Sequence, residues 1–219
     1  MKILISKTLT ILILFICCSS NNKEVERIDI TDGIETNNSL SEYNLLFIGN
    51  SLTYANDLPI LVKTYATTRG KDISVTTIAK GNYALIDHWA DGVIQKHIES
   101  EDYDFVIVQQ GPSSQTYGRE LLIEYGRKIS ALCKSNNTKL AYYMVWPSLT
   151  YYKTFDGVIY SYTRAADING DILCSVGEVW KSHFDETNDF SYYGKDGFHP
   201  SLLGSTVAAQ TIYESLFPQ

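Results

Sequence analysis

From Tyr43 onward the sequence alternates between short apolar runs and longer amphipathic stretches, and this alternation limits the fold to few classes. The predicted strands are short apolar or β-branched runs bounded by turn residues, at 45–48, 73–78, 105–108, 140–145 and 172–176. The predicted helices carry apolar residues three and four apart, at 58–69, 84–100, 119–134, 155–168 and 202–217. Strands that alternate with helices predict a parallel sheet covered on both faces. We therefore expect one α/β domain over residues 43–219, with three α/β/α layers and a mostly parallel, flavodoxin-like sheet.

The first 17 residues have a different character. Lys2 and Lys7 precede an apolar run at residues 9–16. This run is shorter than the roughly 20 residues that a membrane-spanning helix needs, and it fits the core of a signal peptide. We expect residues 1–17 to be removed on export.

Two cysteines, Cys17 and Cys18, follow the apolar run directly. This arrangement resembles a bacterial lipoprotein signal, in which a cysteine becomes the lipidated first residue of the mature chain. The small residue before Cys18 favours Cys18 as the lipidated residue, with Cys17 as the alternative. Residues 18–42 are polar and without sustained apolar periodicity, so we expect a flexible tether. The protein is then anchored by its lipid at the periplasmic face of a membrane or at the cell surface, or is secreted if no lipid is added.

The charge balance and the cysteine count exclude several classes of protein. Lys and Arg number 18 and Asp and Glu 25, a formal net charge of −7. Nucleic acids require a basic surface, so we expect no nucleic-acid partner. Four cysteines are too few for a disulfide scaffold, and we expect Cys133 and Cys174 to be free. No zinc-like spacing occurs, so we expect no metal and no cofactor. The sequence assigns no oligomeric state.

Polar residues follow the predicted strands, at the edge where ligands bind in parallel α/β sheets. Ser51 lies just after the first strand, and Asp196 and His199 lie just before the last helix. A serine hydroxyl is a weak nucleophile that needs an imidazole to accept its proton, and the imidazole needs a carboxylate that fixes its tautomer. Asp196 and His199 are three residues apart and can form that pair locally. These three residues are our catalytic candidates.

The segments that carry these residues resemble the motif blocks of the SGNH (GDSL-type) hydrolase superfamily, in the same order along the chain. Gly-Asn-Ser at 49–51 is similar to the first block, and Asp-Gly-Phe-His-Pro at 196–200 to the last. The resemblance implies that Ser51 is the nucleophile, His199 the base and Asp196 the residue that orients His199. It also implies that the backbone N–H groups of Ser51 and Gly81 form an oxyanion hole.

The third block departs from the family pattern. The family carries Gly-x-Asn there, with the Asn side chain donating to the oxyanion, whereas this chain has Gly-Pro-Ser at 111–113. Ser113 stands at the Asn position, and its hydroxyl is the candidate replacement. The side-chain amides of Gln109, Gln110 and Gln115 are the alternatives.

Further residues near the strand ends are candidates for contacts with substrate. They are Asn50, Gln110 and Trp146, of which Trp146 is the best candidate for a pocket wall because an aromatic face stacks on a sugar ring. His88 either lines the pocket or packs in the core. Two other histidines stand without acidic or cysteine partners in the sequence pattern, and we expect packing or surface roles for them: His97 and His183.

Together these residues and the resemblance predict an exported serine esterase. We expect it to hydrolyse small acyl esters, above all O-acetyl groups on carbohydrate, through an acyl-enzyme intermediate. One alternative is a lysophospholipase or thioesterase of the same fold. The other is a surface lipoprotein that binds carbohydrate without turnover. The altered third block keeps this last alternative open, whereas the presence of Ser51, Asp196 and His199 together argues against it.

Overall fold

The computed structural model describes residues 34–37 and 41–218. The expected signal peptide and both lipidation candidates, Cys17 and Cys18, lie outside the described residues. Among the helices of the described part, none combines the length and apolar character needed to cross a membrane.

The centre of the molecule is a six-stranded sheet with the order β1-β3-β2-β4-β5-β6. Its strands are β1 (Ile34–Asn37), β2 (Tyr43–Gly49), β3 (Ile73–Ala79), β4 (Phe105–Val108), β5 (Lys139–Tyr143) and β6 (Ile172–Cys174). Strands β2 to β6 run parallel to one another, and β1 pairs antiparallel with β3. The five parallel strands have the flavodoxin-like order. The expected α/β class and mostly parallel sheet are therefore confirmed.

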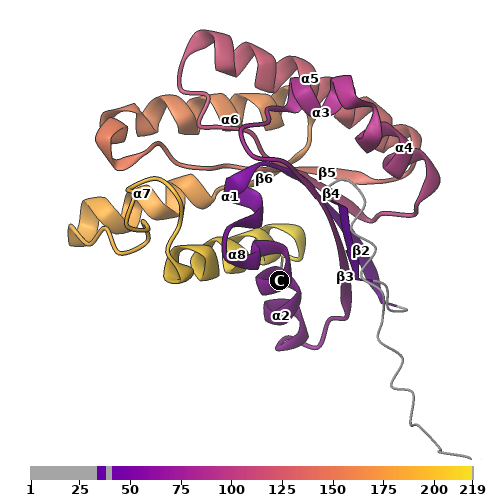
Figure 1. Cartoon of the computed structure of the whole chain (residues 1–219), viewed down its shortest axis with the longest axis horizontal. Coiled ribbons are helices and arrows are strands. Elements are labelled where there is room, and N and C mark those ends of the chain that lie inside the picture. The colour runs from indigo at the N-terminus through magenta and orange to yellow at the C-terminus, as the bar shows by residue number, and fades with distance from the viewer. Residues whose placement is uncertain (1–33, 38–40, 219) are drawn as a thin grey trace, which may run out of the picture.

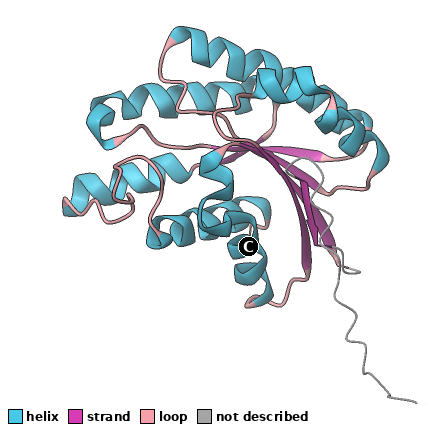
Figure 2. Cartoon of the chain, viewed as in Figure 1, coloured by secondary structure: helices cyan, strands magenta, loops and turns pink. Residues whose placement is uncertain are grey.

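Helices cover both faces of this sheet (Figures 1 and 2). Helices α3 (Leu85–Asp91), α4 (Val93–Ser100), α5 (Thr116–Ser135) and α6 (Phe155–Asn169) lie above it in Figure 1. Helices α1 (Ser51–Tyr54), α2 (Leu58–Thr67), α7 (Val176–Thr187) and α8 (Leu202–Leu216) lie below it. The described residues also include two 3-10 turns, at Ala55–Asp57 and at Leu149–Thr154.

The burial of the central strands explains why the sequence pattern predicts them. Leu45, Leu46, Phe47 and Ile48 of β2 are all 0% exposed. Because helices cover both faces, side chains of either direction enter the core, and the strand is a continuous apolar run rather than an alternating one. The core of the domain therefore lies on both sides of β2 and its neighbours.

The structure differs from the sequence prediction at both ends of the sheet, in one expected helix, and in α7, which the sequence did not predict. Residues 34–37, expected to belong to a flexible tether, form β1, whose backbone pairs with the otherwise unpaired edge of β3. The single helix expected at 84–100 is broken into α3 and α4 at Gly92, whose φ of 71° suits a glycine and ends α3. The strand expected to reach Val176 ends at Cys174, and Val176 begins α7.

Candidate active site

The candidate site lies where the chain leaves β2 and β4 in opposite directions. In the flavodoxin-like order these two strands flank the point where the strand order reverses, and loops that diverge there leave a crevice at the carboxyl ends of the strands. Ser51 follows β2, and the segment 109–115 follows β4. The fold therefore places the predicted nucleophile at the position where open α/β sheets bind ligands.

The turn that carries Ser51 is held by two side chains. Asn50 is the N-cap of α1, and its Oδ1 accepts a hydrogen bond from the N–H of Leu52 at 3.1 Å. The Asn50 N–H donates to Oε1 of Gln109 at 2.9 Å, and the Thr53 hydroxyl donates to the same oxygen at 2.8 Å. Gln109 is 0% exposed. The buried amide of Gln109 thus ties the start of α1 to the end of β4.

The loop before α8 brings Asp196 and His199 together. Oδ1 of Asp196 accepts the backbone N–H groups of Phe198 at 3.0 Å and of His199 at 2.9 Å, which folds the loop around the carboxylate. Oδ2 of Asp196 lies 2.6 Å from Nδ1 of His199. The hydrogen bond from the His199 ring, followed by that from the Phe198 N–H, lowers the pKa of Asp196 below its ordinary value. Asp196 is therefore ionised at neutral pH and accepts the proton of Nδ1.

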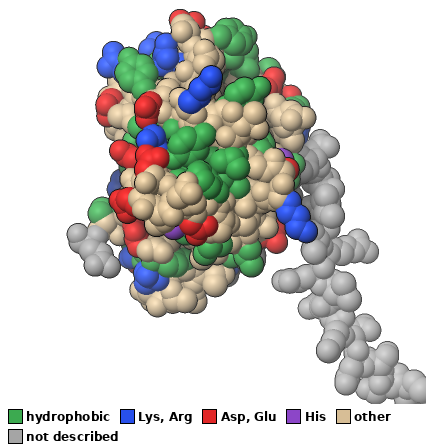
Figure 3. Space-filling model, turned by 90° about the vertical axis from the view of Figure 1, so that its left-hand side faces the viewer, with side chains coloured by type: hydrophobic (Ala, Val, Ile, Leu, Met, Phe, Trp, Pro, Cys, Tyr) green, Lys and Arg blue, Asp and Glu red, His purple; other side chains and the backbone are tan. Residues whose placement is uncertain are grey.

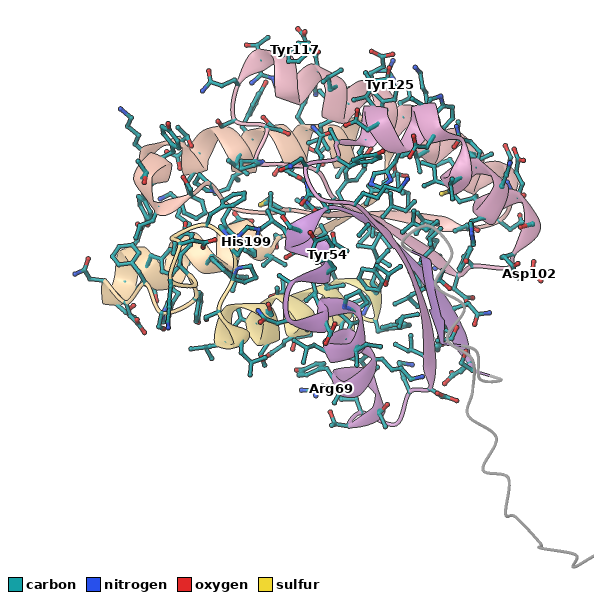
Figure 4. The ribbon with its side chains drawn as sticks, viewed as in Figure 1. Tyr54, Arg69, Asp102, Tyr117, Tyr125 and His199 are labelled. Atoms are coloured by element: carbon teal, nitrogen blue, oxygen red, sulfur yellow. The ribbon has the colours of Figure 1, made fainter. Side chains whose placement is uncertain are left out.

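The second nitrogen of His199 faces Ser51. Nε2 of His199 lies 2.9 Å from Oγ of Ser51, although the two residues are 148 positions apart in the chain. With Nδ1 protonated toward Asp196, Nε2 accepts from the Ser51 hydroxyl. Figure 4 shows His199 beside α1, the helix that begins with Ser51. Ser51, His199 and Asp196 thus form one continuous hydrogen-bonded chain, which is the arrangement that can move a proton from a serine to an imidazole.

Two backbone N–H groups are available next to this chain. Gly49 and Ala79 face each other in the β2–β3 ladder, so Ser51 and Gly81, each two residues further on, leave neighbouring strand ends. Within residues 34–37 and 41–218, neither the Ser51 N–H nor the Gly81 N–H donates a hydrogen bond. Both N–H groups can therefore donate hydrogen bonds to a bound oxygen that carries negative charge.

Three polar side chains of the segment after β4 form hydrogen bonds within that segment and its neighbours, whereas the sequence suggested that they face a ligand. Ser113 has a φ of 58°, and its hydroxyl donates to the Gly111 carbonyl at 2.9 Å. Gln110, 2% exposed, donates through Nε2 to the Ser113 hydroxyl at 2.8 Å and to the Gly118 carbonyl at 3.0 Å. Gln109 donates through Nε2 to the Gln110 carbonyl. These three side chains stabilise the segment itself, and neither Ser113 nor Gln110 offers an uncommitted donor to a ligand.

Asn50 and Trp146, two further candidates from the sequence, are buried, and so is His88. Nδ2 of Asn50 donates to the Tyr83 carbonyl at 2.9 Å, so its amide is also committed. Trp146, expected to form a pocket wall, is 0% exposed, and its Nε1 donates to the Phe198 carbonyl at 2.9 Å. His88 is buried, and its Nε2 lies 2.8 Å from the Gly49 carbonyl. Asn50 and Trp146 therefore act on the loops that carry Ser51 and His199, and His88 packs in the core.

A cavity of about 520 Å³ opens beside the His199 loop. It is lined by residues from the segments after β4 and β5 and from the loop before α8: Pro112, Ser114, Gln115, Pro147, Ser148, Tyr151, Thr154 and Phe198. Phe198 directly precedes His199 in the chain. Figure 3 views the end of the molecule that lies on the left in Figure 1, and shows apolar side chains gathered near the middle of that face. We call the cavity formed by the eight lining residues the Tyr151 cavity.

Sequence reasoning missed the roles of Gln109 and of the residues that line the Tyr151 cavity. The sequence suggests Gln109 only as an alternative oxyanion donor, whereas its Oε1 holds the turn before Ser51. Its position directly after a predicted strand is a partial signal, and the fold adds that this strand, β4, lies beside β2. The cavity combines segments that are far apart in the sequence, and no single motif marks it.

Comparison with solved structures places the fold among those of SGNH hydrolases. A candidate SGNH hydrolase from Slackia heliotrinireducens is 23% identical with a TM-score of 0.67, over 80% of this chain and 98% of that one. TesA is 15% identical with a TM-score of 0.63, over 80% of this chain and 98% of that one. A catalytic mutant of Axe2, an acetylxylan esterase from Geobacillus stearothermophilus, is 15% identical with a TM-score of 0.62, over 82% of this chain and 96% of that one.

These likenesses establish the α/β fold, with five parallel strands flanked by helices, and at this level of identity they establish the fold alone. Comparison of the sequence with protein-family models gives no match. Comparison with curated protein sequences gives none either.

Proposed function

We propose that this protein is a serine esterase of the SGNH type that removes small acyl groups, above all acetyl, from carbohydrate. The observation that carries the proposal is the hydrogen-bonded chain from Ser51 through His199 to Asp196, with distances of 2.9 and 2.6 Å. A protein that only bound its ligand would have no use for a serine, an imidazole and a carboxylate in this geometry. These three hydrogen-bonded residues also lie where the strand order of the sheet reverses, which is where ligands bind in such folds.

The proposed reaction has two halves. Oγ of Ser51 attacks the ester carbonyl carbon while Nε2 of His199 takes the serine proton, and the N–H groups of Ser51 and Gly81 stabilise the charge on the carbonyl oxygen. The tetrahedral intermediate collapses, and the departing alcohol takes its proton from His199. Water then attacks the acyl-enzyme by the same route, which releases the acid and restores Ser51. Asp196 keeps the His199 ring oriented and stabilises its positive charge throughout.

The substrate class is supported by the fold likeness and by the expected export. Axe2, which shares the fold, is named as an acetylxylan esterase. A lipid on Cys18 would hold the domain at a membrane surface, where extracellular or periplasmic carbohydrate is accessible. A lysophospholipase or thioesterase is the rival within the same chemistry.

A fluorophosphonate tests whether Ser51 is an activated nucleophile. We expect the full chain to gain the mass of one adduct, and the Ser51→Ala variant to gain none. The matched control is Ser135→Ala, at the end of α5, which should label as the wild type does. Hydrolysis of acetylated glycosides should follow the same pattern. A folded wild-type protein that takes up no adduct would contradict the proposal and favour the binding-protein alternative.

The lipid anchor is tested separately. Cys18→Ala should move the protein from the membrane fraction to the soluble fraction of the cells that produce it, whereas Cys17→Ala should leave it with the membranes. If Cys18→Ala still sediments with membranes, lipidation at Cys18 is wrong.

A further inference from the structure

The Tyr151 cavity lies on a defined side of the candidate site. The free N–H groups of Ser51 and Gly81 lie at the ends of β2 and β3. The cavity lies at the ends of β4 and β5, on the opposite side of Ser51 in the sheet order. It shares Phe198 with the loop that carries His199. A carbonyl oxygen directed toward Gly81 therefore points away from this cavity.

The proton transfer of the proposed reaction determines which part of an ester meets the cavity. The departing alcohol must place its oxygen within hydrogen-bond reach of Nε2 of His199, because that nitrogen returns the proton. The Phe198 ring, which lines the cavity, lies 5.2 Å from the His199 ring between centroids. A group that extends from the leaving oxygen past the Phe198 side of His199 would therefore enter the cavity. At about 520 Å³ the cavity is also of a size that holds a whole ring-sized ligand rather than an acetyl group.

The residues that line the cavity indicate what kind of alcohol it takes. All eight are uncharged. Tyr151, Phe198 and two prolines provide flat apolar faces, and Tyr151 is 62% exposed. Hydroxyl and amide groups are supplied by Ser114, Gln115, Ser148 and Thr154. Phosphorylated leaving groups, such as the glycerophosphate part of a lysophospholipid or the thiol coenzyme A, would meet no lysine or arginine among these residues.

We propose that the Tyr151 cavity is the subsite for the alcohol part of the ester, and that it takes a neutral hydroxylated ring such as a pyranoside. The apolar face of the ring stacks on Tyr151, and its hydroxyl groups reach the polar lining residues. This inference rests on the proposed function, and it adds Tyr151 as the residue that determines specificity for the alcohol.

The test compares two series of esters on the full chain. In the first series the acyl group is always acetyl, and the alcohol is ethanol, methyl β-xylopyranoside or choline. In the second series the alcohol is always ethanol, and the acyl group is acetyl, butyryl or hexanoyl. The variants are Tyr151→Ala, Tyr151→Phe, which keeps the ring, and the control Tyr160→Ala. Tyr160 is 57% exposed and does not line the cavity.

We expect the wild type to prefer the acetylated xyloside to ethyl acetate and to acetylcholine. Tyr151→Ala should lower the xyloside-to-ethyl ratio of kcat/KM by about threefold to tenfold, mainly through KM, because a stacked ring contributes roughly that much binding. Tyr151→Phe should keep the wild-type ratio, and Tyr160→Ala should change neither series.

Two results would overturn the inference while leaving the proposed function intact. One is that Tyr151→Ala alters the acyl-length series but not the alcohol series, which would make this an acyl pocket. The other is that it alters neither series in an enzyme that still hydrolyses ethyl acetate. If the wild type hydrolyses no ester and takes up no fluorophosphonate, the proposed function fails and the inference fails with it.

Discussion

Trp146→Phe is expected to destabilise the protein more than Trp180→Phe, although both substitutions remove the same part of an indole from the same stack. The two rings are 3.5 Å apart between centroids with 12° between their planes, and both side chains are 0% exposed. Nε1 of Trp146 donates to the Phe198 carbonyl at 2.9 Å. Nε1 of Trp180 is buried with no hydrogen-bond partner among the described residues. The pair therefore isolates one hydrogen bond from an otherwise equal change in volume.

The size of the difference follows from the groups left unpaired. Trp146→Phe leaves the part-buried Phe198 carbonyl without its donor, which costs about 1 kcal/mol or more. Trp180→Phe removes a buried N–H that has no partner in the described part of the chain, so it loses no hydrogen bond there and relieves an unpaired donor. Both variants lose similar packing, which cancels in the comparison. We expect the free energy of unfolding to be about 1–3 kcal/mol lower in Trp146→Phe than in Trp180→Phe.

The assay is urea unfolding followed by circular dichroism, combined with steady-state kinetics on an acetyl ester. Because Phe198 adjoins His199, loss of its hydrogen bond should also lower kcat with little change in KM, by up to about 10²-fold if the imidazole is displaced. Trp180→Phe should leave kcat closer to the wild-type value. Equal losses of stability in the two variants would refute the reasoning, and an unchanged kcat in Trp146→Phe would refute its kinetic part.

Three further predictions concern other residues. Asp196→Asn should lower kcat by about 10⁴-fold without unfolding the protein, because an amide does not hold His199 in the required tautomer; a loss of less than tenfold in the kinetics would contradict the role of Asp196. Burial lowers the pKa of His88 below 6.5, so the unfolded chain takes up its proton first, and stability should decline as the pH falls below about 6.5. His88→Gln should reduce that decline in urea unfolding at about pH 7.5 and about pH 5.5, and equal declines would refute it. Burial raises the pKa of both Cys133 and Cys174 to about 12. Peptide mapping should find both thiols unmodified by iodoacetamide at about pH 8 until urea is added, and labelling of the folded protein would count against this.

The parts of the fold that the sequence predicted are those whose signal is local. Residues 45–48 and 105–108 are continuous apolar runs because helices cover both faces of the sheet. Asp196 and His199 lie in one short loop, so their pairing needs no knowledge of the fold. β1 was missed because its pairing with β3 uses the backbone, which leaves no apolar pattern in the sequence.

The errors in the candidate site concern the direction of side chains. The sequence places Trp146 just after β5, but whether its ring faces solvent or the core depends on Trp180, on another element. Ser113 stands where the family pattern has a donor, but its φ of 58° accompanies a hydroxyl bonded within its own loop. The role of Gln109 depends on which strand lies beside β2. Side-chain direction and strand order are properties of the whole fold, so motif spacing alone could not supply them.

The separation of Ser51 from His199 by 148 positions also has a kinetic consequence. Asp196 and His199 can pair as soon as their own loop forms. The hydrogen bond to Ser51 requires the two ends of the domain to meet, with α8 packed against α2. In refolding, secondary structure and the local carboxylate–imidazole pair can be present while the serine still lacks its base. The rate at which activity returns would then measure the formation of this long-range contact rather than the formation of the sheet.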